Sequence, residues 1–155
     1  MSTPFRVSRN VELSVLDYLD TELASHWTGV TLVKGFQQAY KAALPVVCVR
    51  LISTASNRKE IGNYELKKLH NIVIDIFATS DGQRLDLADF ITDTIAQGIP
   101  YYTFSNQSGS PAELEKIADG KLVINSFLDN SRLEFGEDVE IQDKFRHIIS
   151  FTVRR

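Results

Sequence analysis

An apolar stretch that leads through a capping motif into a helical pattern constrains this fold most strongly. Residues 69–78, LHNIVIDIFA, are apolar or β-branched at nearly every position. This composition predicts a strand that is buried on both faces and therefore lies in the middle of a sheet. Ser80 and Gln83 then have the S-x-x-Q spacing of a capping box, which predicts that a helix begins there.

The predicted helix has one apolar stripe and one acidic face. The stripe consists of Leu87, Ala88, Phe90, Ile91 and Ile95, and the acidic face consists of Asp86, Asp89 and Asp93. This arrangement is typical of a helix that packs on a sheet and exposes its other side to water. Gly98 followed by Pro100 predicts the end of the helix.

Hydrophobic spacing and turn residues predict the remaining elements. Before the central strand we expect a helix from Val11 to about Ser25, with Asn10 as its N-cap, and then a short strand over Gly29–Val33. We then expect a partly helical connection over Lys34–Leu44 and a strand over Val46–Ser53. A polar hairpin tip over Thr54–Asn63, with a positive φ at Gly62, should join that strand to the central one. After Pro100 we expect a loop over Asn106–Gly120, a strand over Lys121–Phe135 with a bulge at Asp129–Asn130, a turn at Gly136–Glu137 and a last strand over Val139–Val153.

These elements predict an α+β fold for residues 1–155 as a single domain. We expect a mixed, mostly antiparallel sheet of about five strands with two main helices packed against it. Short hairpin connections favour antiparallel pairing, and the second helix is the one crossover that we expect to be long enough to change strand direction.

Composition excludes several classes of function. The formal net charge of −3 provides no basic field for nonspecific nucleic-acid binding. Cys48 is the only cysteine and lies in the apolar run PVVCVRLI, which indicates a buried thiol rather than a nucleophile. We expect no signal peptide and no membrane span, because no apolar run is long enough.

The sequence contains no motif that predicts a cofactor, a metal ion or a catalytic site. The glycines have no phosphate-loop spacing, and His26, His70 and His147 lie in different predicted elements. We interpret His147 as a core or interface histidine. The basic residues near the C-terminus, Lys144, Arg146, Arg154 and Arg155, are interpreted as a solvated strand edge.

One enzymatic alternative remains open, in which carboxylates hold magnesium as in nucleases. Asp75 in the central strand, with Asp86 and Asp89 at the start of the helix, supplies the oxygen ligands that such a site needs. The competing interpretation is that the two helix carboxylates belong to its ordinary solvated face.

Five features together resemble the tail terminator, or tail completion, proteins of tailed bacteriophages. They are the leading amphipathic helix, LPVVCVRL at 44–51, EIGN at 60–63, IVIDIFATS at 72–80 and QRLDLADFITDTI at 83–95. The resemblance covers most of the first hundred residues. It implies a mixed sheet flanked by helices and a hexameric ring that caps the finished tail tube and faces the head connector.

The same resemblance implies that the protein acts by geometry rather than by chemistry. The expected partners are further copies of the chain, the tail tube protein and the head-tail connector or neck protein, while DNA passes through the lumen without specific binding. The expected location is the tail or neck of the virion, and the host cytoplasm during assembly. By position at the hairpin tip, Arg58, Lys59, Glu60 and Ile61 are candidates for subunit or tube contacts, and the alternative is a solvated hairpin end.

Two further interpretations stay beside this one. A head-closure or connector adaptor ring is the nearest variant. An adaptor domain of a cellular complex is the other, and neighbouring tail-tube and portal genes would exclude it.

Overall fold

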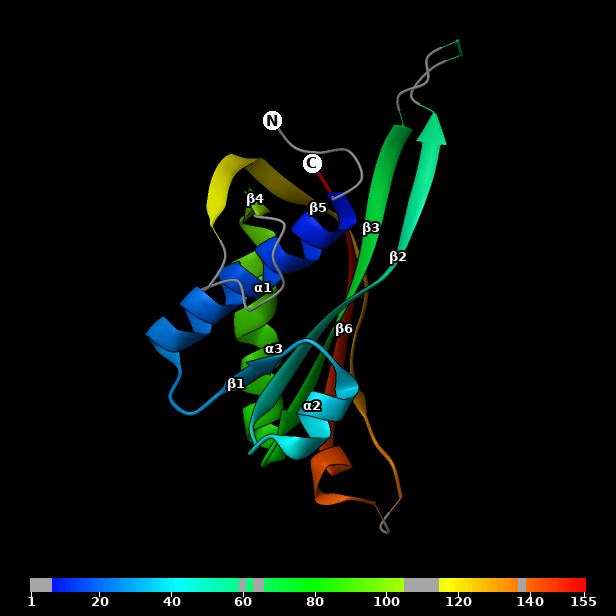
Figure 1. Cartoon of the computed structure of the whole chain (residues 1–155). Coiled ribbons are helices and arrows are strands. Elements are labelled where there is room, and N and C mark those ends of the chain that lie inside the picture. Colours follow the sequence, from blue (N-terminus) through cyan, green and yellow to red (C-terminus); the bar gives the residue numbers. More distant parts are fainter. Residues whose placement is uncertain (1–6, 59–60, 63–65, 105–114, 137–138) are drawn as a thin grey trace.

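The computed structural model describes residues 7–58, 61–62, 66–104, 115–136 and 139–155. Its elements are α1 (Val7–His26), β1 (Thr31–Val33), α2 (Phe36–Lys41), β2 (Val46–Arg58), β3 (Leu66–Ala78), α3 (Asp81–Ala96), β4 (Ile99–Phe104), β5 (Lys116–Leu133), the 3₁₀ turn η3 (Ile141–Asp143) and β6 (Phe145–Arg154), arranged as Figure 1 shows. No helix among the described residues is long and apolar enough to cross a membrane.

The described strands form one mixed sheet of six, in the order β1-β2-β3-β6-β5-β4. This arrangement confirms the predicted α+β class and the central position of the 69–78 strand, which is part of β3. The expected number of about five strands was wrong, because the aromatic segment IPYYTF forms β4. Pro100 is tolerated there because β4 is an edge strand.

The only parallel pairing among the described strands joins β1 to β2, with Thr31 opposite Val46. The other described pairs are antiparallel. The expectation that the second helix, α3, would be the one long crossover was therefore wrong. The connection between Val33 and Val46, which contains α2, is instead long enough to act as the crossover.

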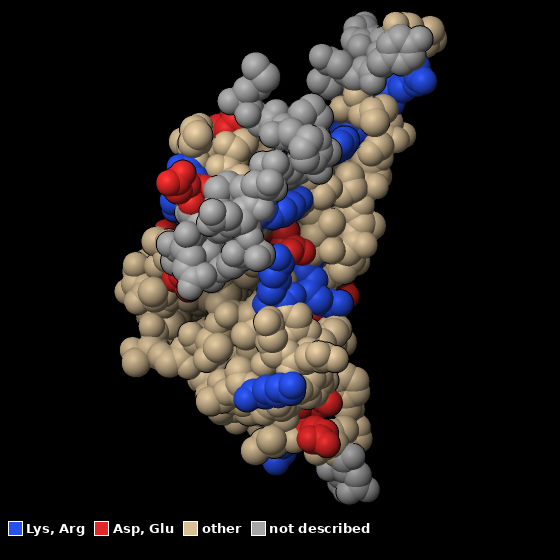
Figure 2. All heavy atoms as spheres, in the orientation of Figure 1, with Lys and Arg blue, Asp and Glu red and all other residues tan. Residues whose placement is uncertain are grey.

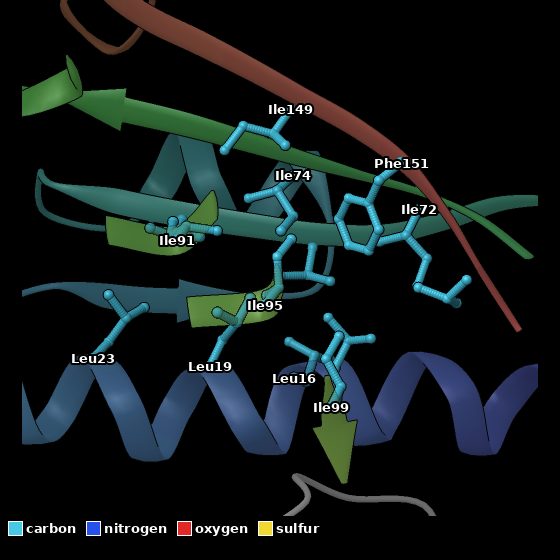
Figure 3. Packing of buried hydrophobic residues seen from close by; sticks show 14 of the residues in the cluster. Leu16, Leu19, Leu23, Ile72, Ile74, Ile91, Ile95, Ile99, Ile149 and Phe151 are labelled. Atoms are coloured by element: carbon cyan, nitrogen blue, oxygen red, sulfur yellow. The ribbon is translucent and has the colours of Figure 1, made fainter. Parts of the chain in front are cut away.

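The main hydrophobic core lies between one face of the sheet and helices α1 and α3. Figure 3 shows Leu16, Leu19 and Leu23 of α1 pointing toward Ile72 and Ile74 of β3. The predicted stripe of α3 is buried, except that Phe90 is half-buried, and Asp86, Asp89 and Asp93 are exposed as expected. Burial of each large side chain contributes roughly 1.5–3 kcal/mol, so this face supplies most of the stabilisation.

A smaller apolar cluster lies on the opposite face of the sheet. Ala39 of α2 packs there against Val46, Cys48 and Phe77, and all four side chains are fully buried. Among the described elements, α2 is the helix that covers this face. The two faces of β3 therefore have different neighbours: Ile72, Ile74, Ile76 and Ala78 lie in the cluster with α1 and α3, and Phe77 lies in the cluster with α2.

The capping box at the start of α3 is present with one difference. The Ser80 hydroxyl accepts a hydrogen bond from the Gln83 backbone N–H at 3.2 Å, as the S-x-x-Q spacing predicts. The Gln83 side-chain oxygen accepts from the backbone N–H of Thr79 at 2.8 Å rather than from that of Ser80. The two bonds satisfy the backbone N–H groups of Thr79 and Gln83, which lie before and after the start of the helix. They therefore stabilise the turn from β3 into α3.

Asn10 is not the N-cap of the first helix, because α1 begins before it at Val7. Its buried side chain instead accepts a hydrogen bond from the backbone N–H of Phe104 at 3.3 Å. Ser14, one helical turn later, accepts from the N–H of Tyr102 at 3.0 Å. Helix α1 thus satisfies outward-facing donors of the edge strand β4.

The boundaries of the last two strands differ from the prediction. Strand β5 begins at Lys116, inside the expected loop, and residues 106–114 of that loop lie outside the described residues. The register of β5 shifts between Phe127 and Asp129, which confirms a bulge beside the predicted position. Of the turn expected at Gly136–Glu137, Glu137 lies outside the described residues.

Strand β6 begins only at Phe145, so Val139 and Ile141 do not belong to it as predicted. Residues Ile141–Asp143 form the turn η3 instead, and the side chain of Gln142 in this turn binds to the chain around α2. Its side-chain amide donates to the carbonyl oxygens of Ala39 and Ala42 at 2.9 and 3.0 Å. This contact joins η3 to α2 and turns the chain away from the line of the strand.

Candidate interaction surfaces

The hairpin of β2 and β3 extends beyond the rest of the sheet. Strand β3 pairs with β6 only as far as His70 opposite Val153, whereas its pairing with β2 continues to Leu66 opposite Arg58. We call the paired residues 55–58 and 66–69 the arm, and Figure 1 shows it projecting from the body. The expected loop from Thr54 was thus too long, because β3 provides strand partners through Arg58.

The predicted contact residues lie at the end of this arm. Arg58 is the last residue of β2 and is exposed, and Ile61 has a relative exposure of 104%. Lys59 and Glu60 lie outside the described residues. Gly62 has a φ of 84°, as expected for a turn that favours glycine. The described tip thus presents one cationic and one apolar side chain to solvent.

Strand β2 has an open outer edge. Strand β1 pairs only with Val46–Cys48, and the Glu12 carboxylate accepts from the N–H of Leu51 at 2.9 Å. Beyond that point, no described strand lies on the outer side of Ile52–Asn57, which we call the β2 edge. Ile52 is 50% exposed there.

Strand β5 has a second open edge on the other side of the sheet. Strand β4 pairs with β5 only between Lys116 and Leu122. No described strand lies on the outer side of Val123–Leu133, which we call the β5 edge. Phe127 and Leu128 are 41% and 56% exposed there.

The two edges differ in the residues that commonly protect strand edges. The β2 edge reads ISTASN and contains neither a charged residue nor proline, whereas the β5 edge reads VINSFLDNSRL and contains Asp129 and Arg132 but no proline or lysine. Register shifts interrupt the first half of the β5 edge, whereas Asp129–Leu133 pairs regularly with β6. The β2 edge pairs regularly with β3 from Ser53 onward. Each edge therefore has a regular stretch of similar length that another strand can join.

Asp75 lies in a buried ionic cluster rather than in a metal site. Its carboxylate, 1% exposed, accepts hydrogen bonds from Arg50 at 3.0 Å and from Arg146 at 2.8 Å. The Phe36 ring lies over the Arg50 guanidinium, 3.9 Å from the carbon to the ring centroid. Arg146 is itself buried, so its interpretation as part of a solvated edge was wrong.

The proposed magnesium ligands do not come together. Asp75 shares its face of the sheet with Phe77 and α2, while Asp86 and Asp89 are exposed on α3 across the sheet. The described residues contain no group of three or more His, Cys, Asp or Glu side chains placed to hold a metal ion. Two guanidinium groups already satisfy the Asp75 oxygens, which leaves that carboxylate with the role of an ion-pair partner.

The histidines and the cysteine occupy structural positions. His70 and His147 are buried, and their rings are hydrogen-bonded to Thr54 and Asn130 respectively, which agrees with the interpretation of His147 as a core histidine. Burial, with Lys68 as a second cause, lowers the pKa of His70; burial and Arg84 lower that of His147. Burial raises the pKa of the Cys48 thiol to about 11, which disfavours the reactive thiolate.

Comparison with known proteins assigns no family to the chain. No family model matches the sequence, and no curated protein matches it significantly. The arguments for function therefore come from the residue patterns and from the surfaces described above.

Sequence reasoning missed the partners of Asp75, although a signal was present. Arg50 and Asp75 are the charged residues within the apolar runs VVCVRLI and IVIDIFA, and such charges are buried only when they are paired. The antiparallel hairpin was predicted, and it places the two residues on neighbouring strands. Arg146 could not be found in this way. It lies in β6, which is far from β3 in the chain, and the sequence does not indicate which residues of the two strands pair.

Proposed function

We propose that this protein is a structural component that assembles head to tail into a closed ring, as expected for the tail terminator of a phage or phage-like particle. The observation that carries the proposal is the pair of open strand edges on opposite sides of one sheet. Open edges attract further strands, and a protein retains them where another chain covers them.

The strand directions favour pairing between these two edges. Neighbouring strands from β2 through β3 and β6 to β5 are antiparallel, so β2 and β5 run in opposite directions. When two copies stand side by side in the same orientation, the β2 edge of one copy meets the β5 edge of the next as an antiparallel pair. Such a pair forms the regular perpendicular hydrogen bonds of an antiparallel sheet.

This contact joins two different surfaces, and repeated heterologous contacts generate a ring when the rotation closes. The two edges lie at opposite ends of the strands, because β1 covers the start of β2 and β4 covers the start of β5. Neighbouring copies would therefore be staggered along the strands, as in a barrel with tilted strands. The arm would reach past its own body toward the next copy.

The remaining surfaces are assigned by the same proposal. Arg58 and Ile61 at the tip of the arm would contact the next subunit or the tail tube protein, and the other rim of the ring would meet the head connector or neck protein. Within a ring the modest negative charge of the chain would let DNA pass without specific binding. A head-closure or connector ring would use the same geometry, and binding to purified tail tubes distinguishes the two.

The first test is the mass in solution by light scattering after size exclusion, over a range of concentrations and with purified tail tubes. The proposal expects a species of about 105 kDa, six copies of the 17.5 kDa chain, either alone or released from tubes. A monomer under both conditions would contradict it.

Edge variants test the geometry of the ring. Ile52→Lys and Leu128→Lys each place a charge on one edge, and each should prevent ring formation. Leu85→Lys is the matched control, because Leu85 is an exposed leucine on α3 and belongs to neither edge.

Mixing the two edge variants gives the sharpest result. Each variant retains one intact edge, so an equal mixture should form heterodimers of about 35 kDa from 17.5 kDa chains and nothing larger. A symmetric contact between two β2 edges would instead let Leu128→Lys dimerise alone, and that outcome would reject head-to-tail pairing.

A further inference from the structure

A cavity of about 580 Å³ opens where the sheet divides. Beyond the pair of His70 and Val153, strand β3 continues with β2 into the arm, while Arg154 remains opposite Val123 of β5. The two hairpins separate at this point and leave a space between them. Val7, the first described residue of α1, lies at its side. We call this space the fork pocket.

The fork pocket is lined mainly by basic residues. They are Lys67, Lys68, His70, Arg154 and Arg155, and the described lining includes no acidic residue. Figure 2 shows Lys and Arg side chains along the face from the arm toward the middle of the body. Because the whole chain has a net charge of −3, this concentration of positive charge is local.

Ion pairs between described residues neutralise only part of this charge. Arg155 forms an ion pair with Asp119 at 3.0 Å. His70 is 2% exposed, and its Nδ1 is hydrogen-bonded to the Thr54 hydroxyl at 3.1 Å, which fixes the ring at the pocket wall. Lys68 lowers the pKa of His70 in addition to the effect of burial, so the positive potential acts on groups that face the pocket.

We propose that the fork pocket binds a phosphate-bearing ligand, with Lys68 and Arg154 as the main donors to the phosphate oxygens and Arg155, which also pairs with Asp119, beside them. A phosphate group carries more than one negative charge and several acceptor oxygens, which suits ammonium and guanidinium donors that line one cavity. The volume is larger than a single phosphate needs, and the apolar side chains of Val7 and Leu66 line the same cavity. The ligand class is therefore a phosphoester or a diphosphate rather than a small monovalent anion.

This proposal does not depend on ring formation, because every named residue belongs to one copy of the chain. It can hold if the ring proposal fails, and it can fail if the ring proposal holds. The phosphate can belong to a free phosphoester or to a DNA strand, and the chemistry of the pocket is the same for both.

The test is a titration of the intact protein with pyrophosphate at constant ionic strength, followed by NMR of the histidine ring protons. A bound anion favours the charged imidazole, so the pKa of His70 should rise by roughly one unit. The pKa of His147 should not change, because that residue pairs opposite Ile76, away from the fork. An unchanged pKa of His70 at saturating millimolar pyrophosphate would overturn the proposal.

Variants locate the site. Lys68→Ala removes one charge-assisted contact and should weaken pyrophosphate binding about tenfold. Lys68→Arg keeps a cationic donor at this position and should retain binding. Lys144→Ala is the matched control, because Lys144 is an exposed lysine outside the pocket. Equal binding by Lys68→Ala and the unmodified chain would reject this location.

A short single-stranded DNA identifies the source of the phosphate. If the DNA raises the pKa of His70 at lower concentration than pyrophosphate, and Lys68→Ala abolishes this effect, the ligand is a nucleic-acid strand. If pyrophosphate acts and the DNA does not, the ligand is a free phosphoester. Either result supports the phosphate site, and the absence of both effects rejects it.

Discussion

At the scale of single residues, Asp75 organises the polar contacts on the face of the sheet that α2 covers. Arg50 and Arg146 come from the two neighbouring strands and converge on its carboxylate, and Tyr40 and Arg146 both contact Asp143 beside it. These contacts hold α2 and η3 against the sheet. The guanidinium groups are tolerated in this partly buried site because the carboxylate compensates their charge.

Replacing Asp75 by Asn should therefore strongly destabilise the protein. The change leaves the guanidinium of Arg146 buried without its counter-charge, and the free energy of unfolding should fall by about 3–5 kcal/mol. Urea denaturation measures this loss. Asp86→Asn is the control and should change the free energy by less than about 0.5 kcal/mol, because Asp86 is exposed on α3. Equal effects of the two changes would show that the cluster is not a stabilising unit.

The buried histidines should make stability depend on pH. Burial in the folded state lowers the pKa of His70 and His147 below the ordinary histidine value of 6.5, so below that pH the unfolded chain binds more protons than the folded chain. Their contribution to stability is present above pH 6.5 and is lost as the pH falls through the lowered folded values. Urea denaturation should show that the free energy of unfolding decreases as the pH falls from about 7.5 to about 5.5.

A double variant, His70→Gln with His147→Gln, provides the check on this pH dependence. It should flatten the curve, whereas His26→Gln, on an exposed side chain, should leave it unchanged. A curve that stays equally steep in the double variant would assign the pH dependence to other groups.

At the scale of elements, α1 holds the edge strand β4 by side-chain hydrogen bonds. Asn10 and Ser14, one helical turn apart, accept from the N–H groups of Phe104 and Tyr102. A helix thus occupies the place where another strand would pair. This protection explains why β4 is not among the open edges of the sheet, although it is an edge strand.

Removing the Asn10 side chain should weaken this edge. In Asn10→Ala the buried N–H of Phe104 loses its acceptor, and the free energy of unfolding should fall by about 1–3 kcal/mol. Hydrogen exchange should accelerate at the Phe104 amide. Thr21→Ala removes an exposed hydroxyl that bonds only within α1 and should change neither measurement by a comparable amount. An unchanged Phe104 exchange rate would contradict the role of Asn10.

At the scale of the whole molecule, the arm extends away from the common core, as Figure 1 shows. The arm residues of β2 and the start of β3 are exposed or half-buried, and none belongs to either hydrophobic cluster. The arm therefore adds little to the stability of one copy, and under the ring proposal its exposed surface contacts the next copy.

An arm deletion should separate folding from assembly. Replacing residues 57–67 by Asn-Gly joins Ser56 to Lys68, which face each other across the hairpin, by a two-residue turn. The variant should retain its circular dichroism and cooperative unfolding but should not form the ring or bind tail tubes. Unaltered ring formation, measured by light scattering, would exclude the arm from the interface.

The sequence by itself determined the elements whose signals are local. The central strand and α3 were predicted because their apolar residues repeat at the periods of two and 3.6 that backbone geometry imposes. The cap at Ser80 and the positive φ at Gly62 were predicted because each depends on a few neighbouring residues. The hairpin of β2 and β3 was predicted because the two strands follow each other in the chain.

The tertiary structure decided what depends on residues far apart in the chain. The aromatic segment of β4 became a strand because β5 and α1 supply its hydrogen-bond partners. Arg146 became buried because β6 pairs with β3 and places it beside Asp75. The open edges and the fork pocket exist only where strands of unequal length end beside one another, and strand register is set by packing between segments that no local pattern connects.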